Sequence, residues 1–184
     1  PGGGYWAHAY GGHQFGRWAG QLGDGRAISI GEVYGTCSSS SAATTCSWEI
    51  SLKGAGRTPY SRFGDGRAAL ENGCREFLAG EALTSLGIPS QRALVLIAHQ
   101  TPVIRDPHYT SSPRAVPGGI LVRVAPSFLR FGTLQLAASR QGVPGVLKIV
   151  RYAEGILDNI TNNDMPEARY YREILRQRDE EDEW

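Results

Sequence analysis

Alternating apolar and polar residues predict several strands in the first two thirds of the chain. Residues 27–34 include the run Ala-Ile-Ser-Ile, and residues 47–53, SWEISLK, place apolar side chains on one face and polar side chains on the other. A period of two is typical of a half-buried strand. We therefore expect the apolar face of 47–53 to be buried, and we place Lys53 on the polar face with Glu49 and Ser51.

The pattern changes to a helical period once before the strands resume. Residues 67–86 predict a helix with an apolar stripe, which ends at Gly87-Ile88-Pro89. The stripe consists of Leu70, Cys74, Phe77, Leu78, Leu83 and Leu86. Further strands are expected at 92–98 and 102–105, as a hairpin, and at 120–125, after a turn-rich loop at 106–119.

The two ends of the chain give weaker patterns. Residues 1–19 are rich in glycine and aromatic residues and predict irregular structure, and the polar residues 38–45 predict a loose hairpin tip. After the last strand, Ser127 is a candidate cap for a segment over 127–141 that is helical or extended and that Gly132 interrupts. Helices are expected at 145–157 and 166–178.

The order of these elements predicts an α+β fold. Strands come first, one helix lies among them, and helices follow, as in a small mixed sheet packed on one helix. We expect one lobe at 1–125 and the start of a helical lobe at 126–184.

Composition narrows the class of protein. The chain has 184 residues, 41% of them hydrophobic, which suffices for one domain or for one domain and part of a second. No apolar run is long enough to span a membrane. Three cysteines favour a reducing compartment, with pairing of Cys37 and Cys46 across the hairpin tip as the alternative. The histidines and cysteines show no zinc spacing.

The charged residues are unevenly distributed. The net charge is +1, but residues 179–183 alone carry five negative charges, and all basic residues except Lys53 and Lys148 are arginines. An excess of arginine suits the recognition of phosphate or carboxylate groups. An arginine-rich nucleic-acid-binding domain is an alternative, although the arginines are scattered singly and form no basic stripe.

A glycine-rich phrase occurs twice. Gly20, Gly23 and Gly25 precede Arg26 and a strand, and residues 64–67 repeat the Gly-Asp-Gly-Arg sequence. Glycines before a strand allow backbone N–H groups to approach a phosphate closely, and an arginine adds a two-pronged donor. A plain glycine turn that enters a hairpin is the other interpretation.

Charged residues inside apolar elements require partners. Neither Glu76 nor Glu81 has a clean solvent face on the predicted helix, so at least one of them needs a buried partner, for which Lys53 or an arginine is the candidate. Arg123 lies inside the apolar strand 120–125 and Arg130 follows it. These arginines form either internal ion pairs or phosphate clamps.

The order of these features along the chain is that of the small lobe of a protein kinase: a glycine-rich loop, a lysine at the end of a strand, a glutamate on a helix, and then further strands. In that lobe the loop covers the phosphates, the lysine holds them and the glutamate orients the lysine. The glycine spacing here is not G-x-G-x-x-G, so motif matching alone does not find it.

Several long phrases resemble the selenoprotein O family over most of the chain. They are YGGHQFGRWAGQLGDGRAISIGE, WEISLKGAGRTPYSRFGDGRA, CREFLAGEAL, LGIPSQRAL and RVAPSFLRFG. The resemblance implies a protein-kinase-like fold that binds ATP and transfers AMP to Ser, Thr or Tyr hydroxyls of proteins. It implies that Glu76 supports Lys53. The nucleotide-binding residues that it implies are Gly23, Gly25, Arg26, Lys53, Asp65, Gly66, Arg123 and Arg130.

The resemblance also locates functions beyond this chain. The proton acceptor and the Mg²⁺ ligands of the family belong to a later segment, so we expect no catalytic or metal-binding residue here. VIRDP (103–107) and LDNITNND (157–164) are interpreted as chance likenesses of a catalytic loop. The chain is therefore expected to be the first third of a member, and a catalytically inactive nucleotide-binding fragment is the main alternative.

The resemblance further implies partners and a location. ATP and protein substrates are the expected partners, without nucleic acid or membrane. The location expected is mitochondrial, as for eukaryotic members of the family, or cytoplasmic.

Overall fold

A computed structural model describes residues 4–38, 43–106 and 110–161. Its first element is a hairpin of β1 (Ala9–Gln14) and β2 (Arg17–Gly23), so the prediction of irregular structure over 1–19 is wrong. Phe15 and Gly16 form the two-residue loop with φ values of 53° and 75°, as a type I′ hairpin turn requires. The many glycines conceal the strand alternation because they carry no side chain to mark a face.

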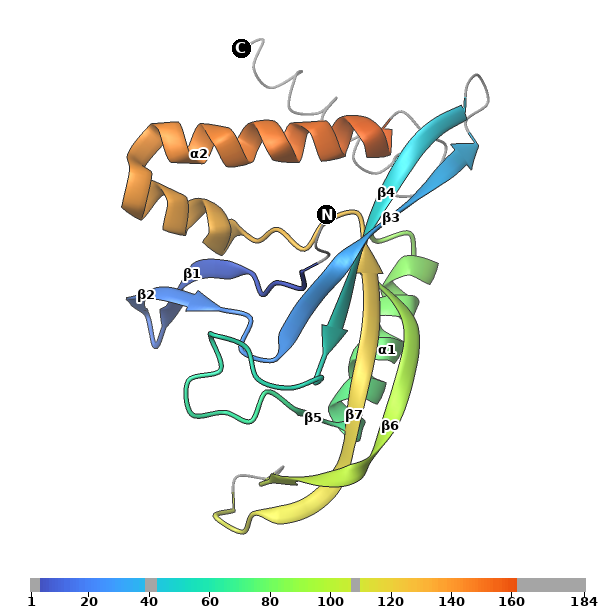
Figure 1. The fold of residues 1–184 in the computed structure, drawn as a ribbon, viewed down its shortest axis with the longest axis vertical. Coiled ribbons are helices and arrows are strands. Elements are labelled where there is room, and N and C mark those ends of the chain that lie inside the picture. The colour runs from blue at the N-terminus through green and yellow to red at the C-terminus, as the bar shows by residue number, and fades with distance from the viewer. Residues whose placement is uncertain (1–3, 39–42, 107–109, 162–184) are drawn as a thin grey trace.

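The main sheet is antiparallel throughout. It contains β3 (Ala27–Ser38), β4 (Ala43–Lys53), β7 (Arg114–Ala125) and the short β5 (Ala68–Ala69), in the order β3-β4-β7-β5. β6 (Arg92–Arg105) pairs with β7. This α+β arrangement confirms the predicted fold class (Figure 1).

β6 and β7 are longer than the sequence pattern predicted. β6 continues through residues 99–101, so 92–98 and 102–105 form one strand and the predicted hairpin is wrong. β7 begins at Arg114, inside the expected loop. The ladder shifts register between His99 and Val103, opposite the stretch of β7 that contains Pro117. A proline is tolerated there because the regular ladder is already interrupted, so it did not end the strand.

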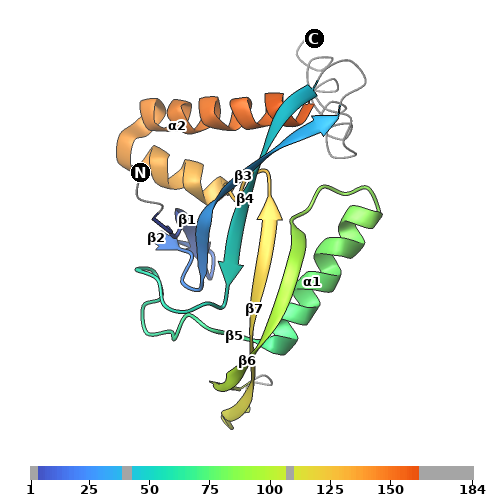
Figure 2. The same cartoon turned by 45° about the vertical axis from the view of Figure 1, so that its right-hand side comes forward.

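Helix α1 (Leu70–Ser85) packs on β6 and β7 through small residues (Figure 2). A Cβ atom at Gly73 would lie 2.6 Å from Leu96, and one at Gly80 would lie 2.8 Å from the Gln91 carbonyl. The predicted leucine stripe is only partly right. Its exposed members are Cys74, Leu78, Leu83 and Leu86. The helix packs on the sheet through Gly73 and Gly80, so the side that carries these four residues faces outward.

Helix α2 (Phe131–Thr161) consists of two arms that meet at a kink, and it contacts β1 and β4 (Figure 1). Gly142 forms the kink with φ 60° and ψ −152°. The predicted segments 127–141 and 145–157 correspond to the two arms, whereas 166–178 lies outside the described residues. Gly132 does not interrupt the helix, and Ser127 precedes it, accepting a hydrogen bond from the Leu129 amide at 3.1 Å.

The two faces of β4 are opposite to the prediction. Glu49 and Ser51 are buried, with 5% and 3% exposure, whereas Trp48, Ile50 and Leu52 are partly exposed. The polar face is buried because it meets polar groups of other segments: Ser29 donates to Glu49, and Arg123 donates to Ser51 at 3.0 Å. Lys53 therefore lies on the face that points into the protein.

The described residues bear on two further expectations, the absence of a membrane span and the state of the cysteines. None of the helices in that part of the chain is long and apolar enough to cross a membrane. Cys46 is disulfide-bonded and Cys74 is a free thiol. The expectation that the cysteines stay reduced is therefore wrong for Cys46.

Candidate functional site

Segments that are distant in sequence enclose a cavity of about 480 Å³. Its lining combines three irregular segments, namely the turn after β2, the loop between β4 and β5 and the segment before α2, with single residues of four strands: Tyr10 of β1, Lys53 of β4, Arg105 of β6 and Arg123 of β7. Seven basic side chains and two aspartates line the cavity: Arg26, Lys53, Arg62, Arg67, Arg105, Arg123, Arg130, Asp24 and Asp65. This surplus of positive charge suits a ligand with several negative charges.

Glu76 of α1 joins two cations at the back of this cavity. Its Oε2 accepts a hydrogen bond from Lys53 Nζ, and its Oε1 accepts from Gln91 Nε2 at 2.8 Å and from Arg123 at 3.0 Å. Burial raises the pKa of Glu76, but the hydrogen bonds from Lys53 and Gln91 and the nearby charges outweigh it, so the pKa is lowered. The predicted buried partner of a helix glutamate is confirmed. Glu81 pairs instead with Arg92 at 2.8 Å.

Arg123 is the most buried cation of the cavity, with a side chain only 6% exposed. It donates to Ser51 and to Gln91, at 3.0 and 3.1 Å, and its guanidinium lies over the ring of Phe128 at 4.9 Å from the ring centre. Burial lowers its pKa, against the attraction of Glu76. Its Nε atom is buried and has no partner among the described residues. Arg123 is thus an internal ion-pair partner that also forms part of the cavity wall.

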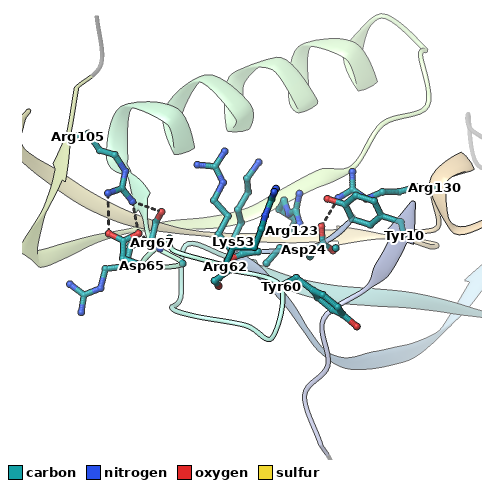
Figure 3. A pocket seen from close by; sticks show the side chains of 17 residues that line it. Tyr10, Asp24, Lys53, Tyr60, Arg62, Asp65, Arg67, Arg105, Arg123 and Arg130 are labelled. Atoms are coloured by element: carbon teal, nitrogen blue, oxygen red, sulfur yellow. Dashed lines mark hydrogen bonds and ion pairs between the residues drawn. The ribbon is translucent and has the colours of Figure 1, made fainter. Parts of the chain in front are cut away.

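Each Gly-Asp-Gly-Arg phrase uses its aspartate to hold a distant arginine. Asp24 accepts from Arg130 at 2.9 Å. Asp65 accepts from both terminal nitrogens of Arg105, at 2.6 and 3.0 Å, and from the backbone amide of Arg67 at 3.0 Å. Figure 3 shows these two pairs at opposite ends of the cavity, with Lys53 and Arg123 between them.

Further contacts stabilise the Asp65–Arg105 and Asp24–Arg130 pairs. The hydrogen bonds from Arg105 lower the pKa of Asp65. Arg130 also lies over the ring of Tyr10, 4.8 Å from the ring centre. Burial and the charge of Asp24 raise the pKa of Tyr10. Both arginines are therefore fixed at the cavity by an aspartate before any ligand is present.

The glycines of the first phrase allow two loops to approach each other. A Cβ atom at Gly23 would lie 2.3 Å from the ring of Tyr60, and one at Gly25 would lie 2.9 Å from the Tyr60 carbonyl. Ser61 donates to the Gly25 carbonyl, which ties the loops together. Gly20 does not line the cavity. The turn interpretation is therefore supported for the packing of this phrase, and direct contact with a phosphate stays a prediction.

Three arginines of the lining are not neutralised. Arg26, Arg62 and Arg67 make no ion pair with any residue that the structure describes. All three are at least partly exposed. They leave the cavity with positive charge that the two aspartates do not balance.

Within the described ranges no group of three or more histidine, cysteine, aspartate or glutamate side chains is arranged to hold a metal ion. Asp24 and Asp65, the acidic residues of the lining, are each bound to an arginine. The described residues of this cavity therefore do not fit a protein-held Mg²⁺ site.

The structure brings all eight predicted nucleotide-binding residues to this one cavity. Sequence reasoning missed Asp24, although it stands between two of the predicted glycines. It also missed Arg105, which belongs to the segment VIRDP that was interpreted as a chance likeness of a catalytic loop. The arginine lies at the end of β6 and pairs with Asp65. The other lining residues that were not predicted are Tyr10, Ala27, Tyr60, Ser61 and Arg62, whereas Gly64 and Arg67 belong to the second Gly-Asp-Gly-Arg phrase.

Comparison with known proteins gives one family. The family described as protein adenylyltransferase SelO matches residues 3–184. A protein nucleotidyltransferase YdiU of Methylobacillus flagellatus is 49% identical over 171 residues, which cover 93% of this chain and 30% of that protein. Proteins of the same name from Aromatoleum aromaticum and Xanthomonas campestris are 53% and 54% identical over 73% and 75% of this chain.

Two facts about these relatives limit what they imply. The chain spans between a quarter and a third of their length. These three relatives are bacterial, and they give no support to the expected mitochondrial location.

Proposed function

Because the chain belongs to the SelO family of protein adenylyltransferases, we propose that its basic cavity binds ATP. We further propose that the chain is the ATP-binding portion of an enzyme that transfers AMP to Ser, Thr or Tyr hydroxyls of proteins. The coarser activity, protein nucleotidyl transfer, is the one that the names of its relatives carry.

One observation carries the proposal. Residues 23–26, 53, 65–66, 123 and 130 come from separate segments, and all of them line one cavity with a surplus of positive charge. A triphosphate carries the opposite charge in the same compact form, and arginine matches phosphate oxygens with two parallel donors. A solvated set of surface charges would not need a buried arginine, Arg123, paired with Glu76 behind it.

Each residue has a role that follows from its position. Glu76 binds Lys53 from the side away from the cavity, so the ammonium group of Lys53 is already oriented toward the cavity before ATP binds. Arg123 and Arg130 are fixed by Glu76 and Asp24, and they neutralise charge that develops on a departing pyrophosphate. Fixed donors of this kind cost little reorganisation when the charge develops.

Mg²⁺ would neutralise further phosphate charge when bound with ATP. Since the described residues do not offer a cluster to hold it, no step of the mechanism is assigned to it. We place its ligands and the proton acceptor in the part of the relatives that lies beyond this chain.

Label transfer tests the reaction. With ATP labelled at the α-phosphorus, protein substrates acquire label when the chain acts within a complete member of the family; with ATP labelled at the γ-phosphorus, they do not. Label from the γ-position on protein would instead indicate a kinase and contradict the proposal. Binding of ATP without any transfer would favour the catalytically inactive alternative.

Salt dependence distinguishes the nucleic-acid alternative. A nucleic-acid-binding domain loses affinity for single- or double-stranded DNA steeply as salt rises, with no special role for Lys53. We expect ATP, and not an oligonucleotide, to bind in a manner that depends on Lys53.

A further inference from the structure

A second cavity lies next to the proposed ATP site. It has a volume of about 710 Å³ and is enclosed by the first turn of α1 and by the outer ends of β6 and β7. Arg26 and Arg105 line both cavities. A molecule in the second cavity therefore adjoins a ligand in the first across these two side chains.

The second cavity holds positive charge that the protein leaves uncompensated. Of its four arginines, Arg75 pairs with Glu71 at 2.7 Å and Arg105 pairs with Asp65 at 2.6 Å. Arg26 and Arg114 make no hydrogen bond or ion pair through their side chains with the residues that the structure describes. These two guanidinium groups are free to bind a ligand.

The strand register places two of these positive charges opposite each other. Arg114 lies directly opposite Arg105 in the β6–β7 ladder. Like charges in directly opposite positions destabilise a pair of antiparallel strands. Asp65 pairs with Arg105, whereas Arg114 makes no ion pair with a described residue. Asp106 also lines the cavity and accepts a hydrogen bond from Thr110 at 3.3 Å, so four arginines face the two carboxylates of Glu71 and Asp106. An anion bound at Arg114 would therefore remove an unfavourable contact as well as form a favourable one.

The rest of the lining indicates what kind of anion fits. Leu70, Val116 and Pro117 add an apolar surface, and Ala69 supplies no side-chain cap for the first turn of α1, which opens on the same cavity. Among the described residues that line this cavity none is aromatic, so these residues offer no platform on which a nucleic-acid base stacks. Separated cations beside an apolar surface match a polypeptide that carries acidic side chains.

We propose that the second cavity binds an acidic segment of the protein that receives the nucleotidyl group. Arg26 and Arg114 bind its carboxylates, and Leu70, Val116 and Pro117 contact the intervening side chains. This inference rests on the proposed function, because it concerns the substrate of the same reaction, and it names a class of substrate: hydroxyls with acidic residues nearby.

Peptide binding tests the proposal on the intact 184-residue chain. The probe is a short fluorescein-labelled peptide with one serine flanked by glutamates, and its counterpart has lysines in place of the glutamates. Fluorescence anisotropy measures binding to the unmodified chain, to Arg114→Glu and to Arg151→Glu, a matched charge reversal at an exposed arginine of α2. Stabilisation by ATP is measured in parallel for each protein.

We expect the glutamate peptide to bind and the lysine peptide not to bind. Arg114→Glu weakens the affinity about tenfold or more, whereas Arg151→Glu leaves it unchanged. Both variants keep the stabilisation by ATP, because neither residue lines the first cavity. Lys53→Ala loses the stabilisation by ATP and keeps the peptide, so failure of the ATP site and failure of the peptide site give different results.

Two results would overturn the proposal. One is equal affinity of the glutamate peptide for Arg114→Glu and for the unmodified chain. The other is binding that appears only when the acidic residues of segment 179–183 are replaced by their amides, since the chain's own acidic segment would then be the occupant.

Discussion

Glu76 is the residue on which the charge cluster depends, because one carboxylate faces both Lys53 and the buried Arg123. Removing one partner of a buried pair leaves the other charge uncompensated. We expect Glu76→Ala to lower the free energy of unfolding by about 3 kcal/mol. Urea denaturation of the purified chain measures the change.

Glu71→Ala is the matched control on the same helix. Glu71 pairs with Arg75 in solvent, where an i,i+4 pair contributes at most about 0.5 kcal/mol. Similar losses for the two variants would mean that the cluster behind the cavity contributes no more than a surface pair.

The buried carboxylate of Glu49 makes stability depend on pH. Glu49 accepts a hydrogen bond from Ser29, lies 2.7 Å from His8 and accepts a hydrogen bond from the Phe128 amide at 3.2 Å. Burial raises the pKa of Glu49, but the hydrogen bonds with His8 and Ser29 outweigh it and the pKa is lowered from 4.5.

A carboxylate with a lowered pKa stabilises the folded state above its unfolded pKa. The contribution of Glu49 is therefore complete above about pH 4.5 and is lost as the pH falls through the lower folded pKa. We expect the free energy of unfolding to fall with acidification over this window, and to fall less steeply in Glu49→Gln. Parallel curves for the two proteins, measured by denaturant titration at each pH, would contradict this assignment.

At the scale of the elements, the glycine turn after β2 packs closely against the loop that contains Tyr60. Gly23→Ala places its Cβ against the ring of Tyr60, so we expect a loss of roughly 1–3 kcal/mol. Tyr60→Ala in the same protein should restore most of it. Gly25→Ala meets the Tyr60 carbonyl instead, and the same second substitution should not restore it.

Gly35→Ala in β3 is the control for this series, because an added Cβ there meets no atom within 4 Å. Chemical denaturation of the single and double variants measures each loss. Equal rescue of Gly23→Ala and Gly25→Ala would show that the two loops do not pack as described.

The kink of α2 depends on a backbone conformation that only glycine adopts readily. Gly142 has φ 60° and ψ −152°, so Gly142→Ala should cost roughly 1–3 kcal/mol. Gly155→Ala, in the second arm and in open space, should instead stabilise the chain by up to about 1 kcal/mol. Thermal unfolding compares them, and equal effects would mean that the kink is not fixed by Gly142.

Local patterns in the sequence predicted the elements that have a clear period. Strand 47–53, helix 67–86 and the arms of α2 were found because their periodicity is local. The N-terminal hairpin was missed because glycines carry no pattern, and the buried face of β4 was reversed because its polar side chains meet partners from other segments.

At the scale of the whole molecule, the order of loop, lysine, glutamate and strand indicated one phosphate site. Arg26, Arg123 and Arg130 were already candidates from their positions, and the family resemblance assigned them to the nucleotide. The pairs that hold those arginines were not predictable in the same way. Asp24 and Arg130 are 106 positions apart, and Asp65 and Arg105 are 40 apart. Such pairs arise from the folding of the chain and leave no period in the sequence.

The central claim is that this cavity binds ATP through Lys53. Thermal unfolding with and without Mg·ATP tests it, on the unmodified chain, on Lys53→Ala and on Lys148→Ala, which removes the other lysine at an exposed position of α2. At a concentration 100 times the dissociation constant, ATP should add roughly 2.7 kcal/mol to the unmodified chain and to Lys148→Ala, and nothing to Lys53→Ala. Equal stabilisation of all three proteins, or a cooperative transition that ATP does not shift in any of them, would contradict the claim.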